Sequence, residues 1–323
     1  MIYDWYRLVR LVGVWRIEVV TIQLPIANVL QMLPGGIELG RPEEDVLPGH
    51  HPFRMTFNWV EATMSWPPGF PLFRYLEVVA GIPYTYRTSQ PYTGAYAGPF
   101  YYMPKVWTST TPGGTFALGG LMWGIPKSLG RFSSNAPPPQ RPPWQGGPLT
   151  GDVGRFSTTL GQPFGLVALG RQVGHEQVPI AGIDWTSSAP YESVLEPDGQ
   201  VRSSFAVMRQ IMDQPLLMKF PLGIGPWWVA ANFKMTWRSA FYREIEATQL
   251  HVYDSFVSGL PIGTYDVPPL SDRDRSVGAY ELYCPMELSA PSSTDVVGWT
   301  YPATTLLGPP GTPGVHSGID TGD

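Results

Sequence analysis

Apolar and β-branched residues follow a strand-like pattern along most of the chain. Short segments rich in Val, Ile, Thr and aromatic residues are bounded by Pro and Gly, which is typical of strands. The predicted strands are residues 15–22, 53–66, 72–80, 100–108, 115–122, 216–220, 233–238, 246–257 and 278–288. Between two of them, Thr111-Pro112-Gly113-Gly114 favours a hairpin turn, because proline fixes φ and glycine accepts a positive φ.

Helical spacing of apolar residues is confined to two short segments. Pro25–Leu33 starts with proline, repeats apolar residues at three- and four-residue intervals, and is followed by Pro34-Gly35-Gly36. Residues 205–212 form the second predicted helix. Few helices and many strands predict a mainly β fold of the α+β class.

Proline and glycine mark the segments outside this pattern. Residues 133–150 are dense in proline and are expected to form an extended surface insertion, although such segments also serve as docking sites for partners. Residues 291–323 are rich in Pro, Gly, Ser and Thr and are expected to form an extended C-terminal arm. We therefore expect one domain over residues 1–290, which lies within the range of large single β domains.

Composition and charge narrow the class of protein. Of the 323 residues 43% are apolar and only 15% charged, which favours a homo-oligomer whose subunits cover part of each other's surface. A net charge of −5 without a basic run excludes the electrostatic footprint of a nucleic-acid binder. The single cysteine, Cys284, cannot form an internal disulfide, and no uncharged apolar run reaches the roughly 18–20 residues that span a bilayer. A soluble cytoplasmic protein that binds no membrane is the expectation.

Lysine is rare in this chain, and one lysine lies in an unusual, apolar sequence context. The chain has four lysines, and Lys127 lies in Gly124-Ile125-Pro126-Lys127-Ser128, directly after Trp123 and just downstream of the predicted strand 115–122. Burial can lower the pKa of a lysine by up to roughly 3–5 units, which makes the amine a nucleophile for a carbonyl carbon. The alternative is that Lys127 buries only its stem and keeps the ammonium in water.

One carboxylate stands out in the same way. Glu77 interrupts the apolar run of the strand 72–80, and a buried carboxylate must be paired or protonated. It is therefore either an active-site residue or the partner of an arginine such as Arg74. The scattered histidines, including His251, lack metal-ligand spacing, and no glycine fingerprint of a nucleotide site occurs. No metal and no cofactor are expected, and His251 is expected to be a packed core residue.

The segment Thr115–Gly130 resembles the active-site segment of the acetoacetate decarboxylase family, in which a Pro-Lys pair carries the lysine that forms a Schiff base. Residues 17–34, 73–80 and 214–221 resemble other parts of that family in the same order. The resemblance implies a bent antiparallel sheet or β-barrel around a hydrophobic cavity and covers most of residues 7–290. It also implies Lys127 as nucleophile, Glu77 as active-site carboxylate, and Arg7 or Arg10 as the arginine that faces the substrate's carboxylate. Trp123, beside Lys127, is a further candidate for substrate binding.

This chain departs from the family pattern at three places. Gly119-Gly120-Leu121 stands where the decarboxylases have Gly-Arg-Glu, Ser128 replaces a second lysine, and residues 84–103 contain no acid. These departures disfavour acetoacetate itself as substrate. The predicted function is a Schiff-base lyase of secondary metabolism acting on a keto acid or a polyketide-like carbonyl compound. The alternatives are an aldolase, dehydratase or cyclase of the same fold, and a cyclase or binding protein that holds an apolar ligand non-covalently.

Overall fold

The structure is a computed structural model, and it describes thirteen stretches of the chain. These are residues 10–42, 46–65, 72–87, 99–109, 127–134, 152–160, 178–187, 190–202, 205–219, 228–231, 233–245, 247–268 and 278–289.

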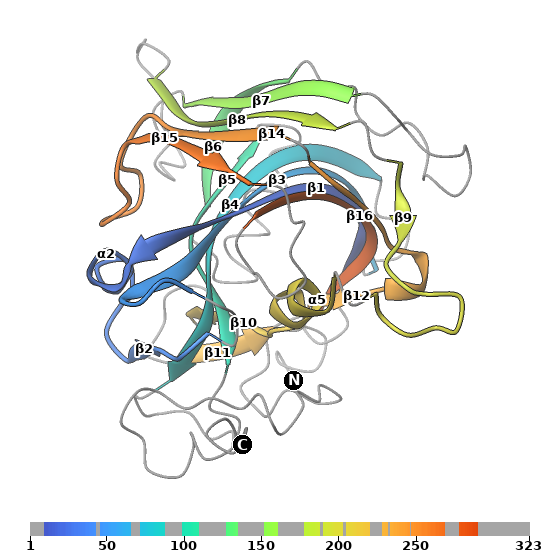
Figure 1. The fold of residues 1–323 in the computed structure, drawn as a ribbon, viewed down its shortest axis with the longest axis horizontal. Helices are drawn as coiled ribbons and strands as arrows, with labels where there is room; N and C mark the ends of the chain where they lie inside the picture. Colours follow the sequence, from blue (N-terminus) through green and yellow to red (C-terminus); the bar gives the residue numbers. More distant parts are fainter. Residues whose placement is uncertain are drawn as a thin grey trace.

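Five long strands form the centre of one strongly curved sheet (Figure 1). In spatial order they are β5 (Phe100–Ser109), β4 (Phe73–Arg87), β3 (His50–Met64), β1 (Arg10–Pro25) and β16 (Gly278–Ser289). Beyond β5 the sheet continues through β6 (Lys127–Ser134), β7 (Asp152–Leu160), β8 (Val178–Ser187), β14 (Ala247–Val252) and β15 (Gly263–Val267). Beyond β16 it continues through β13 (Phe241–Glu244) and β9 (Glu192–Ser193).

Shorter elements complete the described part of the fold. The strands are β2 (Ile37–Leu39) beside β4, β10 (Leu216–Lys219) between β5 and β11 (Trp228–Ala231), and β12 (Phe233–Met235) beside β16. The helices are α2 (Ile26–Leu30), α5 (Ala206–Met212) and the 3-10 turn Trp237–Ser239. Two strand pairs, β5 with β6 and β5 with β10, are parallel, so the sheet is mixed where the sequence predicts an antiparallel one.

Both faces of the central strands are buried, and alternate residues serve each face. On β1, Trp15 and Ile17 belong to one apolar cluster, whereas Val20 and Ile22 belong to another. Side chains of a strand point alternately to opposite sides of the sheet, so each strand contributes to two cores. This explains why β3 is buried over almost its whole length instead of alternating between buried and exposed residues.

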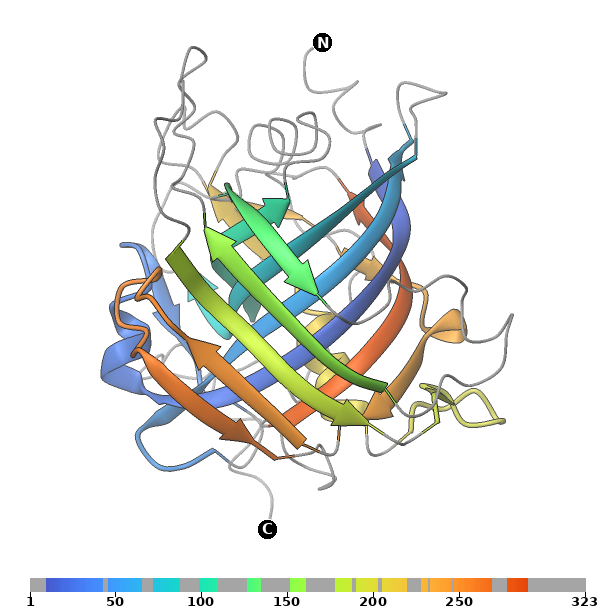
Figure 2. The ribbon, with the colours of Figure 1, turned by 90° about the horizontal axis from the view of Figure 1, so that it is seen from above.

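The convex face is covered by the end of the same sheet. Strands β7, β8, β14 and β15 lie as an outer layer across β3, β4 and β5 (Figure 2). Aromatic side chains join the layers edge to face, with 6.2 Å between the ring centroids of Trp59 and Trp185 and 4.3 Å between those of Trp107 and Phe256. This second core keeps water away from the outer side of the central strands.

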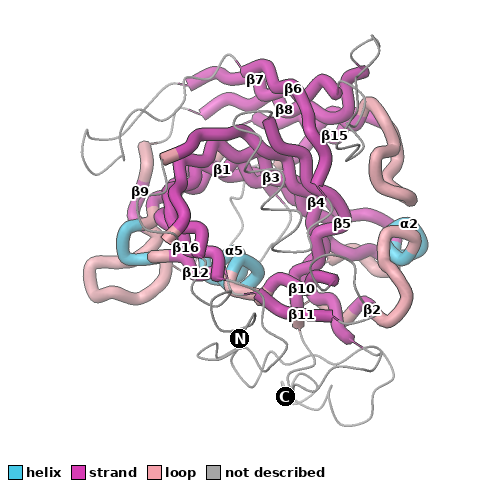
Figure 3. Tube along the Cα trace, turned by 180° about the vertical axis from the view of Figure 1, so that it is seen from behind, coloured by secondary structure: helices cyan, strands magenta, loops and turns pink. Residues whose placement is uncertain are grey.

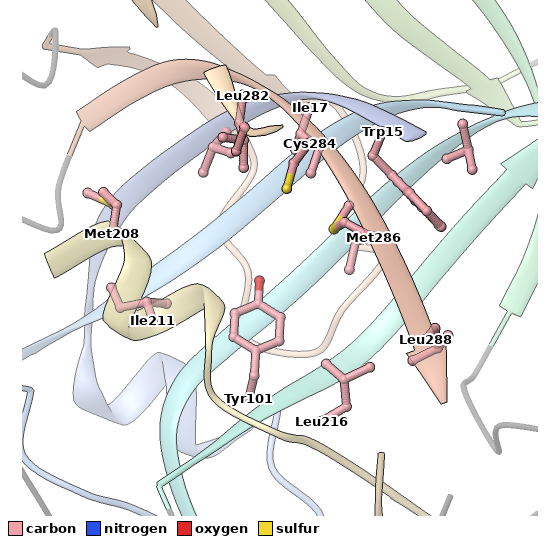
Figure 4. Packing of buried hydrophobic residues seen from close by; sticks show 14 of the residues in the cluster. Trp15, Ile17, Tyr101, Met208, Ile211, Leu216, Leu282, Cys284, Met286 and Leu288 are labelled. Carbon is pink, nitrogen blue, oxygen red and sulfur yellow. The ribbon is translucent and has the colours of Figure 1, made fainter. Parts of the chain in front are cut away.

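The concave face surrounds the other cluster. Helix α5 and strands β10 and β12 lie across the open side of the curve, opposite β1 and β3 (Figure 3). Met208 and Ile211 of α5 project towards Leu282 and Met286 of β16, and Tyr101 of β5 points into the same cluster (Figure 4). The concave face is therefore enclosed on several sides, as in a barrel.

A buried charge cluster lies on the convex side of β1 and β16. Glu281 forms ion pairs with Arg16 and with Arg243, whose Nε is 2.7 Å from Glu281 Oε2, and it accepts a hydrogen bond from the Tyr191 hydroxyl. Burial lowers the pKa of Arg16, but the carboxylates of Glu281 and Glu18 outweigh burial and raise it above its ordinary value. The cluster balances its charges without contact with solvent.

Most predicted elements in the described residues are confirmed. The helix at 205–212 corresponds to α5, while the helix predicted from Pro25 ends early, at Leu30. The strands that were not predicted are β2, β6, β7, β8, β9, β11, β13 and β15. Strand β6 includes the first two residues of the predicted Pro-rich insertion, and the rest of the insertion, the strand 115–122 and the C-terminal arm lie outside the described residues.

Within the described residues, none of the helices has the length and apolar composition needed to cross a membrane.

The charge cluster provides a stability test. We expect Glu281→Gln to lower the free energy of unfolding by about 3–5 kcal/mol, because it leaves two buried guanidinium groups beside a neutral amide. The matched control is Glu61→Gln, which breaks the exposed ion pair with Arg74 and should cost less than about 1 kcal/mol. Urea unfolding followed by tryptophan fluorescence measures both, and equal losses would contradict this account.

Candidate active site

The strand register brings Lys127 and Glu77 to the same face of the sheet. Lys127, the first residue of β6, pairs with Val106 of β5, and Val106 pairs with Val79 of β4. Glu77 lies two residues before Val79 and therefore on the same side of β4. Val79 and Val106 belong to the apolar cluster on the concave face of the sheet. Lys127 and Glu77 therefore both point to this enclosed face.

Lys127 is in an environment that disfavours its charge. Its residue is only partly exposed, and its Nζ lies 5.9 Å from the ring centroid of Tyr75. Burial lowers the pKa of Lys127, and the negative charge of Glu77 raises it, with burial the larger effect. A larger fraction of this amine is therefore unprotonated near neutral pH than of an ordinary lysine. A neutral amine is what attack on a carbonyl carbon requires.

Within the part of the chain that the structure describes, Glu77 is held by an amide and not by an arginine. Its side chain is buried, and Asn58 on the neighbouring strand β3 donates a hydrogen bond of 3.0 Å from Nδ2 to Glu77 Oε1. Arg74 lies on the other face of β4 and pairs with Glu61. The structural alternative for Glu77, an ion pair with Arg74, is therefore wrong.

Two further polar atoms on this face have no hydrogen-bond partner among the described residues. They are Asn58 Oδ1 and Thr108 Oγ1, both buried, and Thr108 pairs directly with Glu77 in the β4–β5 register. A buried polar group without a partner costs free energy, so native proteins retain such groups mainly at functional sites or where water binds. These two oxygens can accept or exchange hydrogen bonds with a bound molecule.

Tyr75 completes the group. It lies two residues from Glu77 on the same side of β4, beside the Lys127 amine. Burial and the neighbouring charge of Glu77 raise the pKa of Tyr75 well above its ordinary value, so the phenol keeps its proton. The site thus combines an amine, a carboxylate and a protonated phenol, which are the groups that imine formation and proton transfer need.

The sequence prediction placed only two members of this group. Tyr75 could have been found from its spacing to Glu77, because residues two apart on a strand share a face. Asn58 and Thr108 carry no such signal, since they join the site through pairing between strands. Arg7 and Trp123, the predicted substrate-binding residues, lie outside the described residues.

The structure does not bring Arg10 to this site. Arg10 is exposed at the start of β1, on the side opposite Trp15 and Ile17, and its Nη1 lies 3.1 Å from Glu287 Oε1. The prediction that His251 is a packed core residue is wrong. Its ring is partly exposed and contacts Asp184 and Thr264, each at 3.0 Å.

Other lysines serve as internal comparisons. Lys105 lies on the convex side of β5, with Nζ 5.6 Å from the ring centroid of Trp107, and burial lowers its pKa too. Lys234 on β12 is exposed. Lys127 shares the concave face with the buried carboxylate of Glu77, which acts on its amine, whereas Lys105 lies on the opposite face of the sheet. Within the described residues, no three His, Cys, Asp or Glu side chains gather as a metal site would require.

No protein-family model and no curated protein sequence matches the chain. Its fold does match solved structures. The enduracididine biosynthesis enzyme MppR in complex with pyruvate aligns over 87% of this chain and 88% of MppR, with 14% identity and a TM-score of 0.50. MppR with the condensation product of pyruvate and imidazole 4-carboxaldehyde aligns over 88% of each chain, with 12% identity and a TM-score of 0.51.

A more distant match is acetoacetate decarboxylase from Legionella pneumophila subsp. pneumophila strain Philadelphia 1. It covers 88% of this chain and 86% of that enzyme, with 11% identity and a TM-score of 0.47. At these identities the likeness shows the fold alone, which is that of MppR, and the mainly β fold predicted from the sequence is confirmed.

The electrostatics of Lys127 can be tested without any substrate. We expect its acetylation by acetic anhydride to reach half of its maximal rate at a lower pH than that of a free lysine side chain in a peptide, because burial lowers the pKa of Lys127. Glu77→Gln removes the charge that stabilises the ammonium and should shift that midpoint further down. Competitive labelling followed by peptide mass spectrometry measures both midpoints.

Glu61→Gln is the control for this test, because Glu61 lies on the opposite face and should leave the midpoint of Lys127 unchanged. An upward shift in Glu77→Gln would contradict the proximity of the two groups.

Proposed function

We propose that this protein is an enzyme that forms an imine between Lys127 and the carbonyl group of a keto acid or a polyketide-like compound. The observation that carries the proposal is a lysine whose pKa is lowered by burial, on the enclosed face of the sheet, beside a carboxylate fixed by Asn58. The MppR fold supports it, since that enzyme was captured with pyruvate, a keto acid, and with a condensation product of pyruvate.

The first chemical step joins the amine to the carbonyl carbon. The lone pair of Lys127 Nζ forms the new C–N bond while the carbonyl π electrons move to oxygen, which takes up a proton. Tyr75, which keeps its proton, is positioned on this face to donate it, and Glu77 accepts a proton from the nitrogen. Glu77 then returns its proton to that hydroxyl group, which leaves as water and gives the protonated imine.

The imine permits two outcomes at the neighbouring carbon. If that carbon carries a carboxylate, the C–C bond breaks, carbon dioxide leaves, and the electron pair passes into an enamine. If it carries a hydrogen, Glu77 removes the proton, and the same kind of enamine attacks a second carbonyl group. Protonation or condensation is followed by hydrolysis with one water, which returns the free lysine.

The second outcome, carbon–carbon bond formation or dehydration, has an observation in its favour. The lysine that follows the nucleophile in the decarboxylases is Ser128 here, and Ser128 is buried. The neighbouring positive charge that would help to lower the pKa of the nucleophilic amine is therefore missing at this position, which sets the chain apart from the decarboxylases. We propose condensation or cyclisation as the main alternative to decarboxylation, and non-covalent binding of an apolar ligand as the third reading.

Assignment to secondary metabolism, a cytoplasmic location and assembly into a homo-oligomer belong to the same proposal. The role of MppR in enduracididine biosynthesis supports the first of these. Exposed apolar side chains such as Leu30, Leu47 and Ile262 support the last, since subunit contacts bury such groups.

Borohydride trapping tests the imine. Incubation with pyruvate and with longer 2-keto and 3-keto acids, followed by reduction and peptide mass spectrometry, should add the reduced substrate to Lys127. The result should disappear in Lys127→Met and fall at least about 10-fold in Glu77→Gln, since losing a positioned proton-transfer group typically costs this much or more. Release of carbon dioxide separates decarboxylation from condensation.

Lys105 is the matched internal control, because burial lowers the pKa of both amines but Lys105 faces the convex side. Labelling of Lys105 at the same rate as Lys127 would show non-specific amine chemistry. Absence of labelling with a compound that the protein converts would leave non-covalent catalysis.

A further inference from the structure

Arg54 is a fully buried cation on the concave face of β3. It has no exposed surface, and it lies four residues before Asn58, on the same side of the strand. Its Nη1 lies 2.9 Å from the sulfur of Met212, its Nη2 lies 3.4 Å from the sulfur of Met208, and its Nε donates to Thr21 Oγ1 at 3.4 Å. Arg54 therefore points from the sheet towards α5.

These partners do not neutralise the guanidinium. Thioether sulfur is a weak acceptor, and within the described residues no carboxylate forms an ion pair with Arg54. Two other buried arginines, Arg16 and Arg243, do have a carboxylate partner, because both form ion pairs with Glu281. A buried charge is normally paired with an opposite charge. The surroundings of Arg54 therefore suit an anion that is not one of the described side chains, such as the anionic group of a ligand.

Two buried tyrosines, Tyr101 and Tyr280, lie within electrostatic range of the same guanidinium. Arg54 pairs with Gly81 in the β3–β4 register. The Tyr101 hydroxyl packs against Gly81 so closely that a Cβ atom on residue 81 would lie only 1.8 Å from the hydroxyl oxygen. Burial raises the pKa of Tyr101 to about 12 and raises that of Tyr280, while the charge of Arg54 lowers both. The Tyr280 hydroxyl is buried and has no hydrogen-bond partner among the described residues.

The residues between Arg54 and the Lys127 site are mainly apolar. Strand β3 contributes Thr56 here, and the neighbouring strands contribute Val19 and Val79 at the paired positions. Strand geometry separates Arg54 from Asn58 by about 13 Å along the chain, at roughly 3.3 Å per residue. The concave face thus has a cationic end at Arg54, an apolar middle, and an amine and carboxylate at Lys127 and Glu77.

We propose that Arg54, together with the hydroxyls of Tyr280 and Tyr101, binds the carboxylate at the far end of an elongated, mainly apolar substrate. The carbonyl group of that substrate is the one that reaches Lys127, so this inference rests on the proposed function and names its substrate class. A guanidinium with two phenols suits a carboxylate, because all three donate hydrogen bonds to anionic oxygen. The substrate class is a medium-chain keto acid whose carboxylate is remote from the reacting carbonyl.

Decanoate is the probe that tests the carboxylate site apart from the imine, since it has a carboxylate and no ketone. We expect full-length wild-type protein to bind decanoate in isothermal titration calorimetry. Arg54→Met should weaken binding by about 10- to 100-fold, the ratio that corresponds to losing one charged hydrogen bond. Methionine fills similar space without charge, and Arg54→Lys should recover part of the affinity.

Decan-1-ol is the matched neutral ligand. It should bind wild type and Arg54→Met alike, because it shares the apolar chain but not the charge. Tyr280→Phe removes one hydroxyl without changing the shape of the ring and should weaken decanoate binding by about 3- to 10-fold. This variant and Arg54→Lys still decide the question if Arg54→Met does not fold, as judged by circular dichroism.

Three results would overturn the inference: no binding of decanoate by wild type, equal binding by wild type and the Arg54 variants, or a parallel loss of decan-1-ol binding. Failure of the proposed function looks different. In that case Lys127 resists borohydride trapping by keto acids, while wild type and Lys127→Met still bind decanoate with Arg54-dependent affinity.

Discussion

Burial of both faces of the central strands is the constraint on which the rest of the structure depends. A sheet that curves around one core and is covered on its outer side by its own last strands leaves little solvent contact for β1, β3 and β4. Every polar or charged side chain on these strands must then find a partner or bear the cost of desolvation. The chemistry of the protein follows from how each of these side chains solves that problem.

The buried cations solve it in three ways. Arg16 is neutralised by carboxylates on the convex face, and this is a structural solution because the charges balance without solvent. Lys127 lies near Glu77, but burial outweighs that carboxylate and favours the neutral amine. Among the described residues, Arg54 forms hydrogen bonds with one hydroxyl and two sulfurs and forms no ion pair with a carboxylate. The convex face thus uses charge for stability, whereas the function proposed above assigns the charge and the amine of the concave face to a ligand.

Particular residues show how far sequence reasoning reaches. Lys127 and Glu77 could be selected because each interrupts an apolar segment, and a family resemblance assigned both to one site. Tyr75 follows from the two-residue period of a strand. Asn58, Thr108 and Arg54 could not be found in this way. Asn58 and Thr108 join their site through pairing with β4, and Arg54 reaches α5, which is distant in the sequence. Arg10, chosen from a position near the first strand, lies on the opposite face.

The sequence by itself determined the local character of the chain: strand-forming segments, two short helices, and a lysine and a glutamate set among apolar residues. These properties depend on neighbours within a few positions, through propensity and the period of two. Only the tertiary structure decided which side of the sheet each charge faces and which charges meet. Strand order and register set those relationships, and a shift of one residue would move every side chain to the other core.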